Sequence, residues 1–113
     1  MTGYNQGDVI LVAYPFGERA GGRKRPVLVI SPNTYNRATG ELLIAQVTSR
    51  VSAPARPGDY AIEGWKEANL PRPALVRSRL ATLKASLVLR KLGTLTEGDW
   101  RGVREALGTV ICV

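Results

Sequence analysis

The sequence predicts a mainly β protein with some α-helix (α+β). We expect a small curled β-sheet or barrel, mostly antiparallel, with short peripheral helices and one amphipathic helix at the C-terminal end. Three observations lead to this prediction. The chain has 113 residues, the size of a single domain, so residues 1–113 are expected to form one unit. Its first two-thirds are short apolar runs separated by glycine, proline and asparagine, which is typical of strands and turns. Only the C-terminal segment repeats apolar residues at helical spacing.

The predicted strands are short runs of apolar and β-branched residues, each closed by turn residues. The clearest run is residues 26–30, which is apolar throughout and is followed by Ser31, Pro32 and Asn33. A short apolar run with such boundaries is typical of a buried strand. Strands are expected in residues 8–14, 26–30, 41–48, 60–62, 74–76 and 80–83, of which the last two could be one bent strand.

The segments between these runs contain turn residues. Residues 17–25 are a glycine-rich basic loop, and residues 52–58 contain two prolines and form a second loop. Residues 34–39 and 65–70 resemble short helical turns. Residues 88–92 fit a strand or a helix, and both alternatives stay open.

The C-terminal segment predicts one amphipathic helix. Thr96 can serve as its N-cap, with acidic residues in the first turn, where the helix dipole favours negative charge. An apolar stripe follows at helical spacing, and we expect it to pack on the sheet. The stripe consists of Trp100, Val103, Leu107 and Val110.

The charge of the chain indicates the chemistry of its partners. Lysine and arginine total 16 against 9 aspartates and glutamates, which gives a net charge of +7. A strongly basic protein attracts polyanions. RNA, DNA or an acidic protein segment are therefore the expected partners.

The absence of histidine restricts the chemistry. The chain has no histidine and one cysteine, so serine–histidine and cysteine–histidine catalysis and histidine-ligated zinc are excluded. The single Cys112 cannot form an internal disulfide, and we interpret it as a small apolar residue of a terminal segment. No metal ion or cofactor is expected.

Nothing in the sequence resembles a targeting segment. No run of about 18 apolar residues is present, so no membrane-spanning helix is expected. Residues 1–6 lack the basic and apolar regions of a signal peptide. The expected location is the cytoplasm.

Two polar segments are candidates for chemistry. The first is the run Arg23, Lys24 and Arg25, which follows two glycines and precedes Pro26, the start of a buried strand. Pro26 favours an extended Arg25 at the strand edge. The alternative is a solvated basic turn. The second segment is Thr48, Ser49 and Arg50 at the end of the 41–48 strand, where hydroxyl residues usually only cap a turn.

If these strands are neighbours, Arg25 and Thr48 could meet at one rim of the sheet. A guanidinium beside a hydroxyl suits RNA cleavage by the substrate's own 2′-OH. Such an enzyme has to align the attack and stabilise the extra negative charge on phosphorus, which a bidentate arginine can do. Thr48 could hold a phosphate oxygen or the 2′-OH. Neither histidine nor metal is required.

The ordered set of these segments resembles the PemK/MazF family of bacterial toxins. The resemblance covers nearly the whole chain and rests on several pieces in the right order. They are residues 7–12, Pro15-Phe16, residues 24–31, Val47-Thr48-Ser49, residues 80–83 and residues 92–96 before the final helix.

The resemblance implies an SH3-like β-barrel with a C-terminal helix, usually a homodimer. It implies a metal-independent, sequence-selective endoribonuclease (an mRNA interferase) that leaves a 2′,3′-cyclic phosphate and a 5′-OH. A cognate antitoxin with an acidic, disordered tail would occupy the RNA groove. By position, Arg25 and Thr48 match the family's catalytic arginine and threonine, and residues 16–24 match its substrate-reading loop. The residues expected to bind substrate are Arg19, Arg23, Lys24, Ser49, Arg50, Arg77 and Arg79.

The chain departs from the family at one place. Some members carry an aspartate, proposed as the general base, before the segment that matches residues 80–83. Residues 76–79 here contain no carboxylate. Thr48, a bound water or Asp59 could replace the base, or no strong base is needed. Arg77 and Arg79 would instead add positive charge to the groove if they face it.

Two other functions are compatible with the expected fold. The same barrel resembles the CcdB gyrase poisons, which act by binding a protein target and do not need Arg25 paired with Thr48. A basic nucleic-acid-binding module without chemistry is the other alternative. Such a module usually presents aromatic side chains for base stacking, and several of the few aromatics here look buried.

Overall fold

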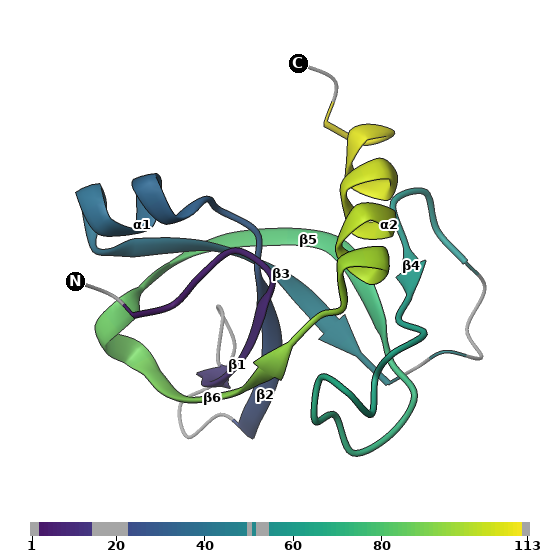
Figure 1. The fold of residues 1–113 in the computed structure, drawn as a ribbon, viewed down its shortest axis with the longest axis horizontal. Coiled ribbons are helices and arrows are strands. Elements are labelled where there is room, and N and C mark those ends of the chain that lie inside the picture. The colour runs from purple at the N-terminus through teal and green to yellow at the C-terminus, as the bar shows by residue number, and fades with distance from the viewer. Residues whose placement is uncertain (1–2, 15–22, 50, 52–54, 112–113) are drawn as a thin grey trace.

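The structure, a computed structural model, describes residues 3–14, 23–49, 51 and 55–111. Within them the chain forms one six-stranded sheet, two α-helices and one short 3-10 helix (Figure 1). The strands are β1 (Asp8–Tyr14), β2 (Arg23–Val29), β3 (Glu41–Thr48), β4 (Tyr60–Ala61), β5 (Leu75–Lys84) and β6 (Val88–Thr94). The helices are α1 (Asn33–Thr39), η1 (Ala85–Leu87) and α2 (Glu97–Gly108).

The strands are arranged in the order β4-β5-β3-β2-β1-β6, and every pairing of the described residues is antiparallel. Register shifts in the β1–β6 and β3–β5 pairs bend the sheet, because an extra residue on one strand increases local curvature. The sheet curls as a small barrel does (Figure 1), but among the described residues no pairing joins its edge strands β4 and β6. The predicted mainly β, antiparallel fold is confirmed, in an open form.

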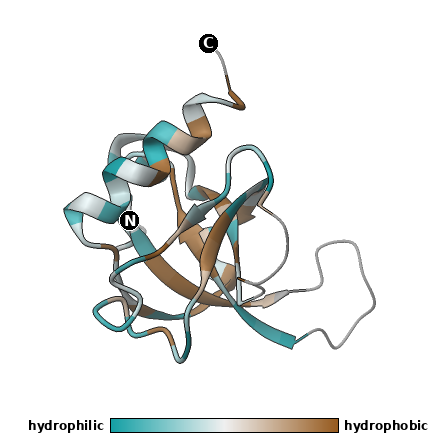
Figure 2. Cartoon of the chain, turned by 90° about the vertical axis from the view of Figure 1, so that its right-hand side faces the viewer, coloured by the Kyte–Doolittle hydropathy of each residue, from teal (hydrophilic) through white to brown (hydrophobic). Residues whose placement is uncertain are grey.

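Both faces of the sheet are buried. Side chains alternate between faces along a strand, and each face contributes to its own core. One core, with Leu28, Val76 and Val103, lies between the sheet, α2 and residues 62–74. The other, with Ile10 and Ile44, consists mainly of strand residues. Figure 2 shows the hydrophobic strand segments in the middle of the molecule, with α2 lying across them.

Most element predictions are confirmed, with three differences. The first is that the predicted strand at residues 74–76 begins one residue later, at Leu75; it and residues 80–83 form one bent strand, β5, and of the two alternatives for residues 88–92 the structure has the strand, β6. The second strand begins at Arg23 rather than at residue 26, because β1 pairs with β2 from Arg23 to Leu28. Val110 was wrongly assigned to the packed stripe of the last helix. The helix ends at Gly108, and Val110 lies beyond it, 47% exposed.

Residues 63–74, of which 70–74 form one wall of the candidate site, are fixed to the rest of the molecule by three sets of contacts. Asn69 donates its side-chain amide to the Leu92 carbonyl at 2.7 Å. Gly93 allows β6 to approach closely, since a Cβ there would lie 2.6 Å from the Ala68 carbonyl oxygen. The third set involves Asp99 of α2. These contacts place the segment beside the sheet without a regular helix or strand.

Asp99 connects α2 to the segment that follows β4. Its buried carboxylate accepts hydrogen bonds from the Tyr60 hydroxyl at 2.6 Å, the Gly64 N–H at 2.8 Å and the Glu63 N–H at 3.1 Å. Burial alone would raise the pKa of Asp99, but these hydrogen bonds outweigh it and hold the pKa below its usual value. The carboxylate therefore stabilises the fold in its charged form.

Asp99→Asn is expected to lower the free energy of unfolding at neutral pH by about 1–3 kcal/mol, because buried donors lose a charged acceptor. A carboxyl with a lowered pKa stabilises the folded state above its unfolded pKa, roughly pH 4, and loses this effect as the pH falls through the folded pKa. The difference between wild type and variant should therefore shrink in urea titrations below about pH 4. A difference that stays constant down to pH 3 would contradict the assignment.

Gly102 on α2 makes room for the Tyr60 ring. A Cβ at this position would lie 2.1 Å from Cε1 of Tyr60. Gly102→Ala should therefore lower the free energy of unfolding by about 1–3 kcal/mol through overpacking, measured by urea denaturation. Gly98→Ala on the same helix is the matched control, since nothing lies within 4 Å of its Cβ, and it should be neutral or stabilising. Equal effects of the two substitutions would argue against the packing explanation.

Candidate functional site

β2 and β3 separate at Pro26. Their last paired residues are Val27 and Gln46. The Ile30 N–H donates to the Leu43 carbonyl on β3, and backbone groups alternate sides along a strand, so the nitrogen of Pro26 also faces β3. Proline has no N–H to donate. The ladder therefore stops there, whereas β2 continues to pair with β1 as far as its first residue.

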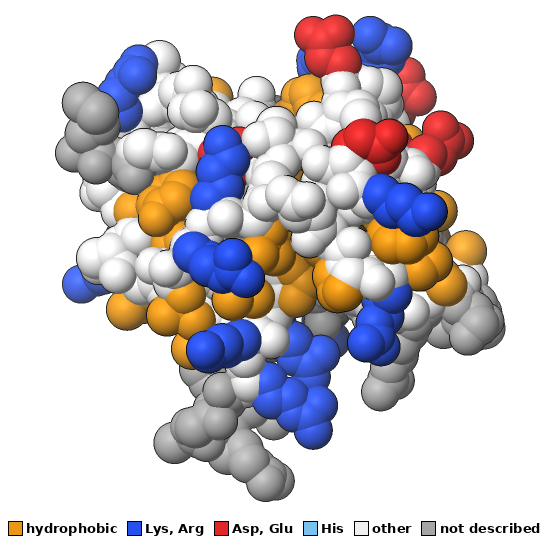
Figure 3. Space-filling view, turned by 60° about the horizontal axis from the view of Figure 1, so that its bottom comes forward, with side chains coloured by type: hydrophobic (Ala, Val, Ile, Leu, Met, Phe, Trp, Pro, Cys, Tyr) orange, Lys and Arg blue, Asp and Glu red, His pale blue; other side chains and the backbone are white. Residues whose placement is uncertain are grey.

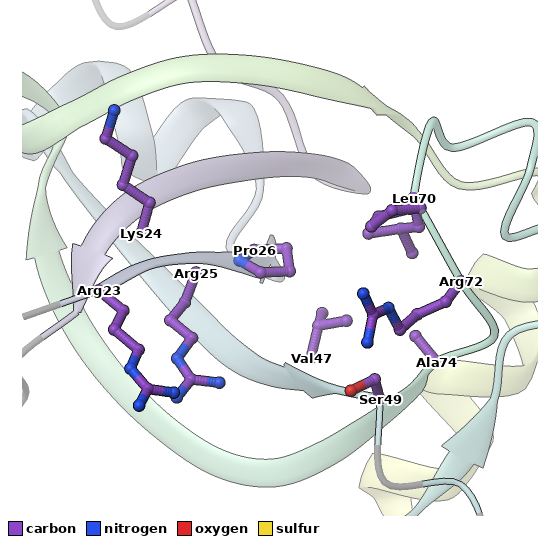
Figure 4. A pocket seen from close by; sticks show the side chains of 10 residues that line it. Arg23, Lys24, Arg25, Pro26, Val47, Ser49, Leu70, Arg72 and Ala74 are labelled. Carbon is purple, nitrogen blue, oxygen red and sulfur yellow. The ribbon is translucent and has the colours of Figure 1, made fainter.

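The space between the separated strands is a pocket of about 320 Å³ (Figure 4). Beyond Gln46, β3 remains paired with β5 as far as Thr48 and Leu75. The first residues of β2 and the last residues of β3 therefore form opposite sides of the opening. Residues 70–74 form the remaining wall. The lining residues are Arg23, Lys24, Arg25, Pro26, Val47, Ser49, Leu70, Pro71, Arg72 and Ala74.

The pocket is strongly positive. Four of its lining residues are cations, and none of its lining residues is a carboxylate. The ion pairs of the described residues lie elsewhere, between Arg77 and Asp59 and between Lys91 and Asp8. In the view of Figure 3, Lys and Arg side chains lie among apolar surface in the lower half of the molecule, whereas most of the visible Asp and Glu lie at the upper right. Unneutralised like charges in a hollow attract anions.

Arg25 lies near the start of β2 and Thr48 is the last residue of β3. Because the strands are antiparallel, both residues lie at the same edge of the sheet. Extrapolating the β2–β3 register by two residues beyond its last pair, Val27 and Gln46, would bring Arg25 opposite Thr48, although the strands are no longer paired there. Arg25 is two residues before Val27, and Thr48 is two residues after Gln46. Their side chains therefore leave their strands on the same face as those of Val27 and Gln46. Arg25 is exposed and lines the pocket, as do Val47 and Ser49 on either side of Thr48.

Arg77 and Asp59 pair with each other, and neither of them lines the pocket. Arg77 donates through Nε and Nη2 to the two carboxylate oxygens of Asp59, at 3.1 and 3.0 Å. This hydrogen bonding holds the pKa of Asp59 below its usual value, against the opposing effect of burial. Arg77 is thus neutralised and lies outside the pocket, and Asp59 is a weakened base. Arg79 is exposed, and it does not line the pocket either.

Several predicted residues lie outside the described part of the chain. Arg19, Arg50 and Cys112 are among them, as is most of the loop 16–24 that was expected to read substrate. Arg23, Lys24 and Ser49 are described, and all three line the pocket.

Sequence reasoning missed residues 70–74, and with them Arg72. The available signal was the pair of prolines, Pro71 and Pro73, on either side of this arginine. Each proline fixes its own φ and disfavours a helical residue before it. The segment forms neither helix nor strand and bends at Pro71 and Arg72. It therefore presents a cation from an irregular wall of the pocket.

The described residues contain no group of three or more side chains of the types that bind metal ions. No helix among them is long and apolar enough to cross a membrane.

Comparison with known proteins agrees with this geometry. Residues 5–111 match the family model of PemK-like, MazF-like toxins of type II toxin–antitoxin systems. A solved MazE–MazF complex from Deinococcus radiodurans (form II) matches with 25% identity and a TM-score of 0.74, over 97% of this chain and 96% of that one. MazF from the same organism (form I) matches with 27% identity and a TM-score of 0.71, over 95% and 94%.

A third structure supports the fold alone. A mycobacterial endoribonuclease in complex with its cognate antitoxin is 21% identical, with a TM-score of 0.74 over 94% of this chain and 92% of that one. No curated protein sequence matches the chain significantly.

Proposed function

Because the chain belongs to the PemK-like, MazF-like toxins of type II toxin–antitoxin systems, we propose that it is a sequence-selective endoribonuclease that cuts single-stranded RNA without a metal ion. One observation carries this proposal: the cationic pocket where β2 and β3 separate, lined by Arg25 and by the neighbours of Thr48, Val47 and Ser49. Membership of this toxin family supports it. Residues 1–113 would act as one toxin domain in the cytoplasm.

In the proposed reaction the substrate supplies its own nucleophile. The 2′-oxygen bonds to the adjacent phosphorus, the bond from phosphorus to the 5′-oxygen breaks, and a 2′,3′-cyclic phosphate and a 5′-OH result. The proton leaves the 2′-OH for water, and another reaches the 5′-oxygen. Arg25 binds the phosphate oxygens through two N–H groups and stabilises their growing charge. Thr48 holds the 2′-OH or a phosphate oxygen in line by a hydrogen bond.

The other cations would hold the RNA backbone on either side of the cleaved bond. Arg23 and Lys24 lie next to Arg25 on β2, and Ser49 directly follows Thr48, the last residue of β3. Arg19, Arg50 and Arg79 remain proposed contacts, whereas Arg77 is already paired. Since such binding releases counterions, RNA affinity should fall steeply as salt is added.

We propose two protein partners. Solved relatives include complexes of MazF with MazE, and an acidic antitoxin segment would compete with RNA for the same cations. A second copy of the chain would extend the groove, since one pocket of about 320 Å³ cannot hold several nucleotides. Salt-insensitive antitoxin binding would contradict the first proposal. A fully active monomer in analytical ultracentrifugation would contradict the second.

The test is incubation of the purified protein with a long single-stranded RNA in EDTA, with both fragment ends mapped. The proposal expects cuts at a recurring sequence, with cyclic phosphate and 5′-OH ends. RNA that stays intact with a folded protein would refute the enzyme. A protein target would then be sought, beginning with DNA gyrase.

A further inference from the structure

The pocket has two distinct sides. Arg23 and Arg25 are alternate residues of β2, so their side chains leave the strand on the same face. Arg72 extends from the opposite wall, and Figure 4 shows its guanidinium pointing across the pocket toward Val47. One side can therefore hold the reacting phosphate while the other side meets a different part of the nucleotide.

The side near Arg72 suits a nucleobase. Its walls are apolar and rigid, formed by Pro26, Val47, Leu70 and Ala74. Three of these, Val47, Leu70 and Ala74, are at most 6% exposed. The volume of about 320 Å³ is at the small end of ligand pockets. A flat ring can lie against such walls, whereas a phosphate gains nothing from apolar contact.

The polar side chains of the pocket are unusually one-sided. Arg23, Lys24, Arg25 and Arg72 can only donate hydrogen bonds, and the Ser49 hydroxyl is the one side-chain acceptor among the lining residues. Guanine has O6 and uracil has O4 at the ring position where adenine and cytosine have an amino group, and guanine adds N7, so donors satisfy this edge of guanine and uracil. Adenine and cytosine present an amino group, which would face donors and leave hydrogen bonds unmade.

We propose that this pocket is a base-recognition subsite beside the cleaved phosphate, that it selects a base with an oxygen in place of the amino group of adenine or cytosine, that is guanine or uracil, and that Arg72 is the residue that determines this selection. The inference rests on the proposed endoribonuclease function and adds the identity of one base. Pro71 and Pro73 hold the backbone on both sides of Arg72, which fixes where its guanidinium can reach. No acid among the described residues pairs with it.

The test compares wild type, Arg72→Ala and Arg72→Gln on an RNA library randomised around one cleavage site. Wild type should require guanine or uracil at one position, and the library shows which of the two it takes. Arg72→Ala should lose about 5- to 150-fold of the discrimination at that position alone. Arg72→Gln should shift the preference toward adenine, which glutamine can bind with two hydrogen bonds. Arg104→Ala, an exposed cation on α2, is the charge-matched control and should change nothing.

Two outcomes would overturn the assignment. One is a wild-type motif that lacks guanine and uracil at every fixed position. The other is an Arg72→Ala variant that cuts all sequences more slowly by one factor, which would make Arg72 a phosphate contact. A binding measurement tests the base-recognition subsite independently of the proposed endoribonuclease activity. It compares 2′-O-methyl oligo-U, oligo-A and oligo-C by fluorescence anisotropy. A preference for oligo-U that Arg72→Ala removes would support the subsite even if no RNA is cut. Equal binding of all three, together with no gain when one adenosine of oligo-A is replaced by guanosine, would refute it.

Discussion

Replacing Arg25 by alanine is expected to slow RNA cleavage by about 10²–10³-fold, the usual loss when one preorganised donor to the transition-state charge is removed. The fold should survive, because Arg25 is exposed and makes its strand contacts through the backbone, opposite Val12 of β1. Arg25→Lys should recover only part of the rate. A lysine keeps the charge but cannot donate two parallel hydrogen bonds to a phosphate.

Cleavage of the mapped RNA under single-turnover conditions measures this effect. Arg37→Ala is a suitable control, since it removes one positive charge from exposed α1 and leaves the pocket unchanged. Circular dichroism and urea unfolding should show the same fold for all variants. If Arg25→Ala cuts RNA no more slowly than Arg37→Ala, the catalytic role of Arg25 is wrong.

Replacing Pro26 by valine should inactivate the enzyme without removing a single polar group. The new N–H at position 26 would face the Val47 carbonyl and extend the β2–β3 ladder, drawing together the strands that now form the pocket. The reacting groups would be displaced, and a displacement of about 1 Å costs on the order of 10²-fold in rate. Stability should change little. The gained hydrogen bond, about 0.5–1.5 kcal/mol, offsets the loss of the restriction that proline imposes on the unfolded chain, about 0.4–1 kcal/mol.

Hydrogen exchange and cleavage together test this prediction. The amide at position 26 should be protected from exchange, and the cleavage rate should fall. Pro32→Val, at the exposed N-cap of α1, controls for the general effect of losing a proline. A protected amide in a fully active enzyme would show that the opening between β2 and β3 is not required.

The sequence predicted those parts of the fold that depend on local patterns. The buried run at residues 26–30, the bent strand β5 and the capped helix α2 all depend on residues close together in the chain. The same holds for the site where it lies on strands. Arg23, Lys24, Arg25 and Ser49 flank predicted strands, and the structure brings all four to one pocket.

The remaining features depend on contacts between distant segments. In the sequence, Arg77 follows the predicted strand 74–76 just as Arg25 precedes the predicted strand 26–30. In the structure, however, the Asp59 carboxylate, 18 residues away in the chain, neutralises Arg77. Arg72 belongs to the pocket only because Asp99, Asn69 and Gly93 hold its segment against the sheet. Charge alone could not separate a paired arginine from an unpaired one. Val110 was misplaced for a simpler reason, since helical spacing continues in the sequence beyond Gly108, where the helix ends.

One measurement tests the central claim most directly. A short RNA that contains the mapped site is compared with the same RNA carrying a single 2′-deoxy nucleotide on the 5′ side of the cut, both in EDTA. The account predicts that the two bind equally well and that only the first is cleaved, because the attacking oxygen is the substrate's own 2′-OH. Cleavage of the deoxy-substituted RNA at the same bond would show that water or a side chain attacks the phosphorus, and the mechanism built on Arg25 and Thr48 would be wrong.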